Sequence, residues 1–245
     1  MFARHPTPIS TPERRKFSLL DLQRESDVYS RIAGQPHFLK MIEFSTAQGI
    51  VLQGLPNGTL RQYLQTEGPQ ISNSQRLGWA RSIASALRSL HVAKVVHADA
   101  KLENVLLDEE SKAYLIDFSG SWIDGKPGSA IESVRFFLPR DVDSDSTVQT
   151  DLFSLGSTIY EVMTGTQPYH DRDDEVVEER FQQGHFPCLD EVPCGPVIKK
   201  CWAATIHTVD EVILALQDES ATAGFDGTSD PSNQVRSRKQ VTSQL

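Results

Sequence analysis

Two neighbouring segments carry the most informative pattern in this chain: HADAKLEN at residues 97–104 and YLIDFS at residues 114–119. Short apolar runs follow the first segment and open the second, and they predict two brief strands rather than helices. A hairpin formed by these strands would bring Asn104 and Asp117 together. The sequence therefore predicts a cluster of polar side chains at one end of a hairpin.

Asp99, Lys101, Asn104 and Asp117 form a set suited to phosphoryl transfer from ATP. The reaction needs a carboxylate near the attacking hydroxyl, a cation near the transferred phosphate and oxygen ligands for Mg²⁺. Asp99 and Lys101 would supply the first two, and Asn104 and Asp117 would hold the metal. One amide and one carboxylate suit Mg²⁺, which keeps several waters. The alternative is that Asp99 and Asn104 only form local hydrogen bonds in a turn.

The two segments resemble the catalytic loop His-Arg-Asp-x-Lys-x-x-Asn and the Asp-Phe-Gly metal motif of protein kinases. The resemblance implies that Asp99 is the catalytic base, Lys101 contacts the γ-phosphate, and Asn104 and Asp117 bind Mg²⁺. It also implies ATP and Mg²⁺ as cofactors. A lysine two residues after the aspartate is similar to the pattern of Ser/Thr-specific kinases. We expect His97 to be a packed structural histidine rather than an acid or base.

Further segments follow in the order of a protein kinase. FFLPR at 136–140 resembles the Ala-Pro-Glu end of the activation segment, and DLFSLG at 151–156 resembles the buried helix of the large lobe. In that family the position of Asp151 receives backbone N–H groups of the catalytic loop. Cys201-Trp202 resembles the helix pair that ends the domain. These matches favour a protein kinase over the small-molecule phosphotransferases that resemble aminoglycoside kinases.

The hinge and helix C of a kinase have counterparts upstream. GIVLQGLPNGTL at 49–60 is similar to the hinge segment, which implies Leu52 at the gatekeeper position and backbone contacts from Gly54 and Leu55 to adenine. Glu25 is the best match for the glutamate of helix C. The alternative for Glu25 is a solvated helix residue without a special role.

The largest departure from the family lies before Glu25. A kinase carries a Gly-rich phosphate loop and a Val-Ala-Ile-Lys strand ahead of helix C. Here the twenty-four residues before Glu25 contain no glycine, and their one lysine, Lys16, is too close to sit on a separate strand facing that helix. We therefore expect the first three strands of the small lobe to be absent.

Smaller departures occur in the large lobe. Ala98 replaces the arginine of His-Arg-Asp, and Ser119 replaces a glycine whose backbone is permissive. Arg140 takes the place of the Ala-Pro-Glu glutamate, and no arginine stands between Trp202 and Asp210, where the family carries the partner of that glutamate. Because losing both ends of a buried ion pair is nearly neutral, we expect a folded variant that lacks this pair.

The resemblance implies an α+β fold of the two-lobe, protein kinase-like type, with a mainly α-helical C-lobe and a reduced β-containing N-lobe. We expect an irregular arm at 1–15, a kinase-like domain at 16–219 and a disordered tail at 220–245. The domain divides into an N-lobe remnant at 16–54 and a C-lobe at 55–219. Apolar periodicity predicts helices over 18–32, 74–91, 151–163, 175–183, 196–202 and 209–219, and strands at 38–44 and 49–53.

Composition narrows the class of partner. A net charge of −9 argues against a general nucleic-acid binder, and no apolar run approaches the roughly 20 residues that cross a bilayer. Three cysteines without metal-site spacing indicate thiols in a reducing compartment. We expect a soluble, cytoplasmic monomer that acts on a protein substrate or binds a protein partner. The alternatives are a pseudokinase that serves as a protein-binding module, and an N-terminally incomplete kinase.

Overall fold

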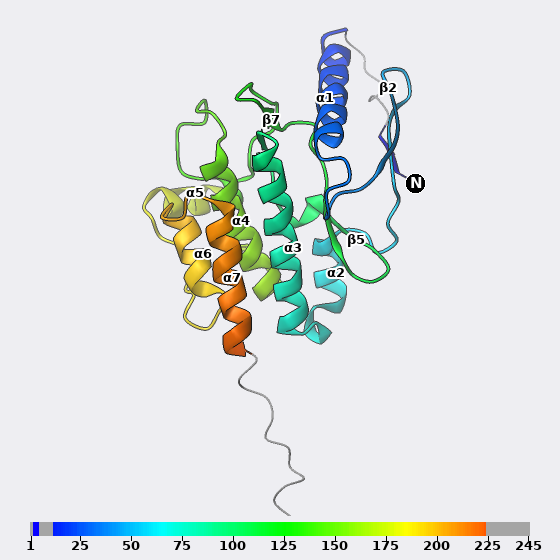
Figure 1. Cartoon of the computed structure of the whole chain (residues 1–245). Helices are drawn as coiled ribbons and strands as arrows, with labels where there is room; N and C mark the ends of the chain where they lie inside the picture. Colours follow the sequence, from blue (N-terminus) through cyan, green and yellow to red (C-terminus); the bar gives the residue numbers. More distant parts are fainter. Residues whose placement is uncertain (1, 5–11, 224–245) are drawn as a thin grey trace, which may run out of the picture.

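The structure, a computed structural model, describes residues 2–4 and 12–223 of the chain (Figure 1). A three-stranded antiparallel sheet and helix α1 form the small lobe, and six further helices make up the described part of the large lobe. The fold is therefore α+β with a mainly helical C-lobe, as expected. The expected start of a disordered tail at 220 is wrong, because helix α7 continues to Ala223, and the rest of the expected tail, from 224 onward, lies outside the described residues.

The small lobe contains a strand that the sequence did not predict. β1 (Phe2–Arg4) pairs with β3 (Gly49–Leu52), which pairs on its other side with β2 (Met41–Ser45), so the order is β1-β3-β2. The expectation of an irregular arm at 1–15 is wrong here. The expectation that all three strands before helix C are absent is also wrong, because β1 precedes α1 and lies beside the hinge strand.

Helix α1 (Pro12–Arg31) begins six residues before its predicted start. Proline is tolerated at the first position of a helix, where its missing N–H costs no intrahelical bond. The helix buries Val28, Tyr29 and Ile32, the last just past its end, towards the sheet and the large lobe. These buried side chains hold α1, the one helix described in the small lobe, against β2 and β3.

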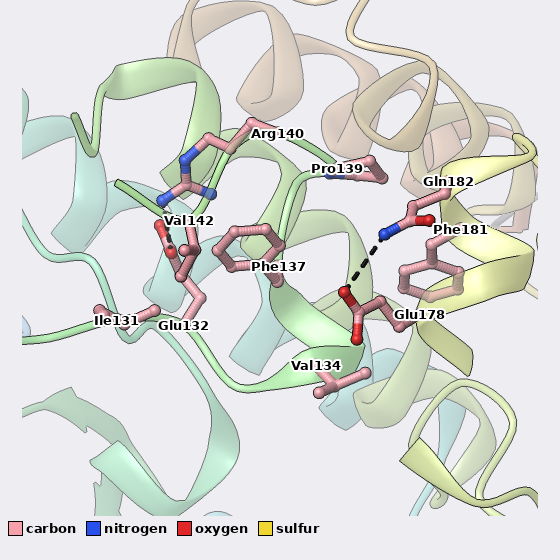
Figure 2. A pocket seen from close by; sticks show the side chains of 10 residues that line it. All are labelled: Ile131, Glu132, Val134, Phe137, Pro139, Arg140, Val142, Glu178, Phe181 and Gln182. Carbon is pink, nitrogen blue, oxygen red and sulfur yellow. Dashed lines mark hydrogen bonds and ion pairs between the residues drawn. The ribbon is translucent and has the colours of Figure 1, made fainter. Parts of the chain in front are cut away.

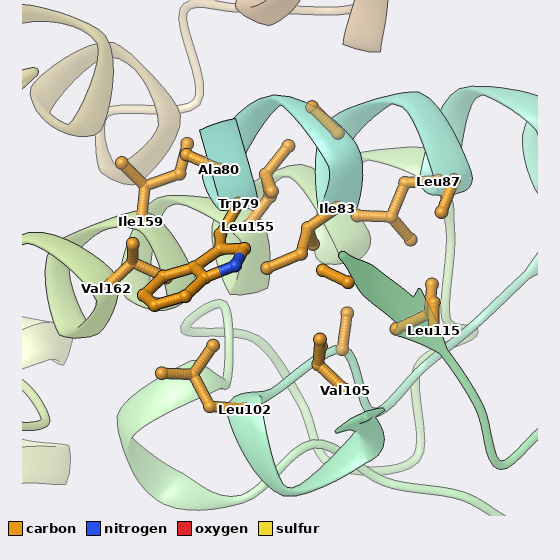
Figure 3. Packing of buried hydrophobic residues seen from close by; sticks show 14 of the residues in the cluster. Trp79, Ala80, Ile83, Leu87, Leu102, Val105, Leu115, Leu155, Ile159 and Val162 are labelled. Carbon is orange, nitrogen blue, oxygen red and sulfur yellow. The ribbon is translucent and has the colours of Figure 1, made fainter. Parts of the chain in front are cut away.

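The large lobe is built around α3 (Asn73–Val92) and α4 (Val148–Thr164), which pack against each other. Their facing side chains include Ile83 and Leu155, and they meet Leu115 from a short hairpin below (Figure 3). Each fully buried aliphatic side chain contributes roughly 1.5–3 kcal/mol of hydrophobic stabilisation. The remaining helices are α2 (Leu60–Glu67), α5 (Asp174–Gln182), α6 (Gly195–Trp202) and α7 (Val209–Ala223).

Two helix ends follow the turn chemistry of the sequence. Thr59, which follows the Pro56-Asn57-Gly58 turn, caps α2 in a capping box with Gln62. Gly165 ends α4 with φ of 82°, a left-handed conformation that glycine adopts without strain. Thr59 therefore marks where α2 begins, and Gly165 marks where α4 ends.

Two small strand pairs position the loops between α3 and α4. β5 (Val105–Leu107) pairs with β6 (Ala113–Leu115) as the predicted hairpin, and β4 (Val95–Val96) pairs with β7 (Trp122–Ile123). The loops that carry the predicted site residues begin and end on these strands. The site therefore rests on the buried face of α3.

Candidate active site

Asp99, Lys101 and Asn104 lie together in the loop between β4 and β5. Lys101 Nζ lies 2.8 Å from Asp99 Oδ2, and Asn104 Nδ2 donates to the same oxygen at 3.0 Å and to the Asp99 carbonyl at 2.9 Å. Asp99 Oδ1 is buried and has no hydrogen-bond partner among the described residues. The carboxylate is thus held through one oxygen, while the other remains able to accept a proton.

The β5–β6 hairpin brings Asp117 to the same place. Ile116 N donates to the Asn104 carbonyl at 2.9 Å, so Asp117 follows directly after a contact with the loop. Asp117 has φ of 70°, a left-handed conformation that costs a non-glycine residue free energy. Ser119 Oγ donates to Asp117 Oδ1 at 2.9 Å. The serine at the glycine position of the motif therefore restrains the carboxylate of Asp117.

His97 is a buried structural residue, as expected. Its Nε2 lies 3.1 Å from the Ile116 carbonyl, and its Nδ1 accepts from Asp99 N at 3.2 Å, so both ring nitrogens have backbone partners. The ring meets Phe118 edge-on with centroids 5.4 Å apart. Phe118 in turn contacts Tyr29 of α1 at 5.1 Å. A chain of ring contacts thus links the loop that carries Asp99 to the small lobe.

Asp151, in the first turn of α4, binds the backbone of the loop that carries Asp99. It is fully buried and accepts from His97 N at 2.8 Å and from Ala98 N at 2.9 Å. His91 of α3 adds a third contact through Nε2, at 2.8 Å. The expectation that Asp151 holds backbone N–H groups of this loop is confirmed.

A charged cluster that the sequence did not suggest connects α2 to the loop that carries Asp99. Arg61 makes two 2.7 Å hydrogen bonds to Glu161 of α4 and an ion pair with Glu103, the residue before Asn104. Burial raises the pKa of Glu161, and the guanidinium of Arg61 partly offsets that shift. Sequence separation hid this cluster, since about 100 residues lie between Arg61 and Glu161.

Glu25 is fully buried on α1, so the interpretation as a solvated residue is wrong. The helix is tied to the segment after Asp117 by Arg24, whose Nη1 donates to the Ser121 carbonyl at 2.9 Å, and by Ser129 Oγ, which donates to Asp21 at 3.0 Å. The position of Glu25 therefore depends on contacts between α1 and residues 117–140.

The predicted hinge residues lie where β3 leads to α2. Leu52 and Leu55 are buried, Gly54 is half-buried, and Gln53 N donates to the Lys40 carbonyl at 3.0 Å. None of the described contacts joins these residues to Asp99. Their assignment to an adenine site stays a prediction.

Arg140 forms a buried ion pair that the sequence did not predict and that differs from the pair of the family. Its Nη2 lies 2.8 Å from Oε2 of Glu132, whose side chain is fully buried, and 3.3 Å from Ser146 Oγ. Its guanidinium also lies over the Phe137 ring, 4.2 Å from the centroid. The pair closes a local loop of eight residues instead of reaching the end of the domain.

Strand β1 was missed in the sequence. It lies beside β3, with Ala3 opposite Val51, and its three residues are too few for an alternating pattern to show.

A family model matches most of the chain. The family described as "Protein kinase domain" matches residues 10–210 of the chain. Among the described residues, no helix combines the length and the apolar character needed to span a membrane.

Three relatives illustrate the similarity. Serine/threonine-protein kinase PknD of Mycobacterium tuberculosis is 29% identical over 181 residues, covering 70% of this chain and 26% of that protein. NUAK family SNF1-like kinase 2 of Rattus norvegicus is 29% identical over 188 residues, covering 72% and 29%. Serine/threonine-protein kinase 1 of Lymantria dispar multicapsid nuclear polyhedrosis virus is 32% identical over 130 residues, covering 53% and 47%. The chain thus spans a quarter to a half of the length of these relatives.

Proposed function

The chain belongs to the protein kinase family, and on that premise we propose that it transfers the γ-phosphate of ATP to a Ser or Thr hydroxyl of a protein substrate. The observation that carries the proposal is the arrangement at Asp99. Its Oδ2 is held by Lys101 and Asn104, whereas its buried Oδ1 has no partner among the described residues. An unpartnered buried oxygen is costly in a structural role and useful in a base.

The residues each take one part of the transfer. Asp99 accepts the proton of the substrate hydroxyl as that oxygen bonds to the γ-phosphorus, and the bond from phosphorus to the bridging oxygen of ADP breaks. Lys101, now 2.8 Å from Asp99, lies close enough to contact the transferred phosphoryl group. The backbone of Gly54 and Leu55, beside Leu52, binds adenine. Glu25 orients the small-lobe side of the nucleotide.

Asn104 and Asp117 would hold Mg²⁺ beside the phosphates. The donor set fits, because Asn104 uses its nitrogen towards Asp99 and so leaves its amide oxygen as an acceptor, and Asp117 supplies a carboxylate. When bound, the metal neutralises charge on the phosphate oxygens. The restraint of Asp117 by Ser119 keeps the carboxylate in place for that contact.

Two features favour weak activity and support a second candidate, a pseudokinase that binds a protein partner. The twenty-four residues before Glu25 contain no glycine for a phosphate loop, and Ala98 stands in place of the arginine of the family's catalytic loop.

The three free cysteines support the proposal of a reducing intracellular compartment. We keep the monomeric state as a proposal that size-exclusion chromatography tests.

Titration of Mg²⁺·ATP into the purified full chain by calorimetry tests the proposed site. We expect weak binding that requires Mg²⁺ and is lost in Asp117→Ala. The matched control is Asp141→Ala, which alters an exposed aspartate far from the hairpin in sequence. This variant should bind Mg²⁺·ATP as the wild type does. Tight binding without Mg²⁺ that Asp117→Ala leaves unchanged would refute the metal assignment. Absence of any nucleotide binding would favour the protein-binding module.

A further inference from the structure

A pocket of about 380 Å³ lies between the end of the activation segment and helix α5 (Figure 2). Phe137, Arg140 and Val142 approach it from one side, and Glu178 and Phe181 of α5 from the other. Large apolar side chains at its mouth are unusually exposed, at 59% for Ile131 and 60% for Val142. Exposed apolar groups beside a pocket favour the binding of an apolar side chain.

The rim of the pocket is strongly acidic. The two flanking segments, 131–145 and 171–182, contain ten acidic and four basic residues, which accounts for most of the net charge of −9. Three of the four arginines are already in ion pairs, Arg135 with Asp174, Arg140 with Glu132 and Arg172 with Asp171. Among the described residues, no ion pair forms at the exposed carboxylates that either line the pocket, as Glu178 does, or lie within three residues of a lining residue along the chain: Asp141, Asp143, Glu175 and Glu179. A basic segment with an apolar residue complements this surface.

The chain itself contains such a segment. Residues 235–241 read Val-Arg-Ser-Arg-Lys-Gln-Val, with three positive charges in four positions between two valines. We propose that residues 235–241 dock in this pocket, with one valine in the apolar floor and Arg236, Arg238 and Lys239 against the acidic rim. The proposal makes the tail an intramolecular ligand of the activation segment.

The connection between α7 and this segment is long enough. Burial raises the pKa of the Cys194 thiol, and the nearby carboxylate of Glu219, close to the end of α7, adds to that rise. Cys194 precedes α6, whose eight residues span about 12 Å and end at Trp202, and the Trp202 ring lies 6.4 Å from that of Phe181 in the pocket. Residues 224–234, when extended, span up to about 36–40 Å.

Docking there would regulate the reaction, and this step rests on the proposed function. The pocket includes Val134, Phe137 and Pro139 of the segment that leads from Asp117 to α4. In this proposal a protein substrate that reaches Asp99 lies along this segment, which continues the chain from Asp117 at the end of the hairpin. A docked tail would compete with that substrate without touching the nucleotide.

A binding measurement without nucleotide tests the docking itself. A fluorescent peptide of residues 230–245 is titrated into the full chain carrying Arg236→Ser, Arg238→Ser and Lys239→Ser, which frees the pocket of its own tail. We expect saturable, salt-sensitive binding. Adding Val142→Asp should weaken it by about tenfold or more, since an apolar contact is replaced by a charge. Val92→Asp, at a valine 75% exposed on α3, is the matched control and should leave binding unchanged.

Unsaturable binding, or binding that Val142→Asp leaves intact, would overturn the proposal. Carbodiimide coupling of the unaltered chain provides a second readout, with amide bonds expected between Lys239 and the carboxylates at 141, 143, 175, 178 or 179. In a mixture of isotopically light and heavy chains these links should join residues of one mass label. Links between labels would assign the pocket to a second copy instead. Neither measurement depends on phosphoryl transfer, so an inactive chain would refute the proposed function and leave the docking result standing.

Discussion

Asp151 holds Ala98 in a conformation that alanine does not favour. Oδ1 of Asp151 accepts the N–H of Ala98 at 2.9 Å, and Ala98 has φ of 63°, in the left-handed region. That conformation costs an L-residue about 1–2 kcal/mol. Because Asp151 is fully buried and also accepts from His97, the loop that carries Asp99 is fixed from the core of the large lobe.

This relationship predicts that Asp151 and Asp99 have different effects on stability. Asp151→Ala removes a charged acceptor and strands buried N–H groups, so we expect it to lower the free energy of unfolding by about 3 kcal/mol or more. Asp99→Asn keeps the size of a partly exposed side chain, so its effect should stay within about 1 kcal/mol. Thermal and denaturant melts of both variants measure the difference. Equal losses in the two variants would contradict these roles.

Much of the large lobe could be predicted because its signals are local. Apolar periodicity predicted a helix over 74–91, which agrees with α3 within one residue at each end. The apolar runs after Asn104 and before Asp117 predicted the hairpin of β5 and β6. Strand β1 could not be found in this way, since three residues carry too little alternation. The burial of Glu25 also depends on packing between distant segments, which no local pattern describes.

Because Arg140 and Glu132 form a buried ion pair, we predict that substitutions at the two positions have strongly coupled effects on the free energy of unfolding. Arg140→Gln leaves the buried carboxylate of Glu132 without its cation, and we expect a loss of about 3–5 kcal/mol. Glu132→Gln with Arg140→Gln removes both charges and should recover most of that loss. A double-mutant cycle from urea melts measures the coupling. Additive effects would show that the pair does not stabilise the fold.

Arg140 also shows what a comparison with the family motif does not reveal. The family pattern places an acidic residue at this position and an arginine partner near Trp202, and this chain has neither. In the structure the charges are reversed: Arg140 is the cation, and its carboxylate partner, Glu132, lies eight residues away in a segment without regular secondary structure. Only the fold brings Glu132 and Ser146 around the guanidinium.

The contact of Ser129 with Asp21 predicts that a negative charge on the activation segment does not switch the chain on. Ser129→Asp places a second carboxylate beside Asp21 and removes the 3.0 Å hydrogen bond to α1. Ala98 offers no guanidinium to receive the charge. We expect transfer activity in Ser129→Asp at or below that of Ser129→Ala in a kinase assay. A severalfold gain in Ser129→Asp alone would refute this prediction.

The cysteines predict a graded reaction with thiol reagents. Cys188 is exposed, whereas burial raises the pKa values of Cys194 and Cys201 to about 12. A raised pKa leaves almost no thiolate at pH 8, and the thiolate is the reactive form. We expect iodoacetamide to modify Cys188 in the native chain and all three thiols in denaturant, as mass spectrometry detects. Rapid native labelling of Cys201 would contradict the packing of α6 against α4.

The proposed function makes Asp99 the base for phosphoryl transfer in this divergent protein kinase domain. Incubation of the purified full chain with radiolabelled ATP, Mg²⁺ and a generic protein substrate, beside Asp99→Asn prepared in the same way, measures it most directly. We predict slow incorporation of label into Ser or Thr of the substrate by the wild type and none above background by Asp99→Asn, with both chains melting alike. Equal incorporation by the two chains, or none by either, would contradict the claim.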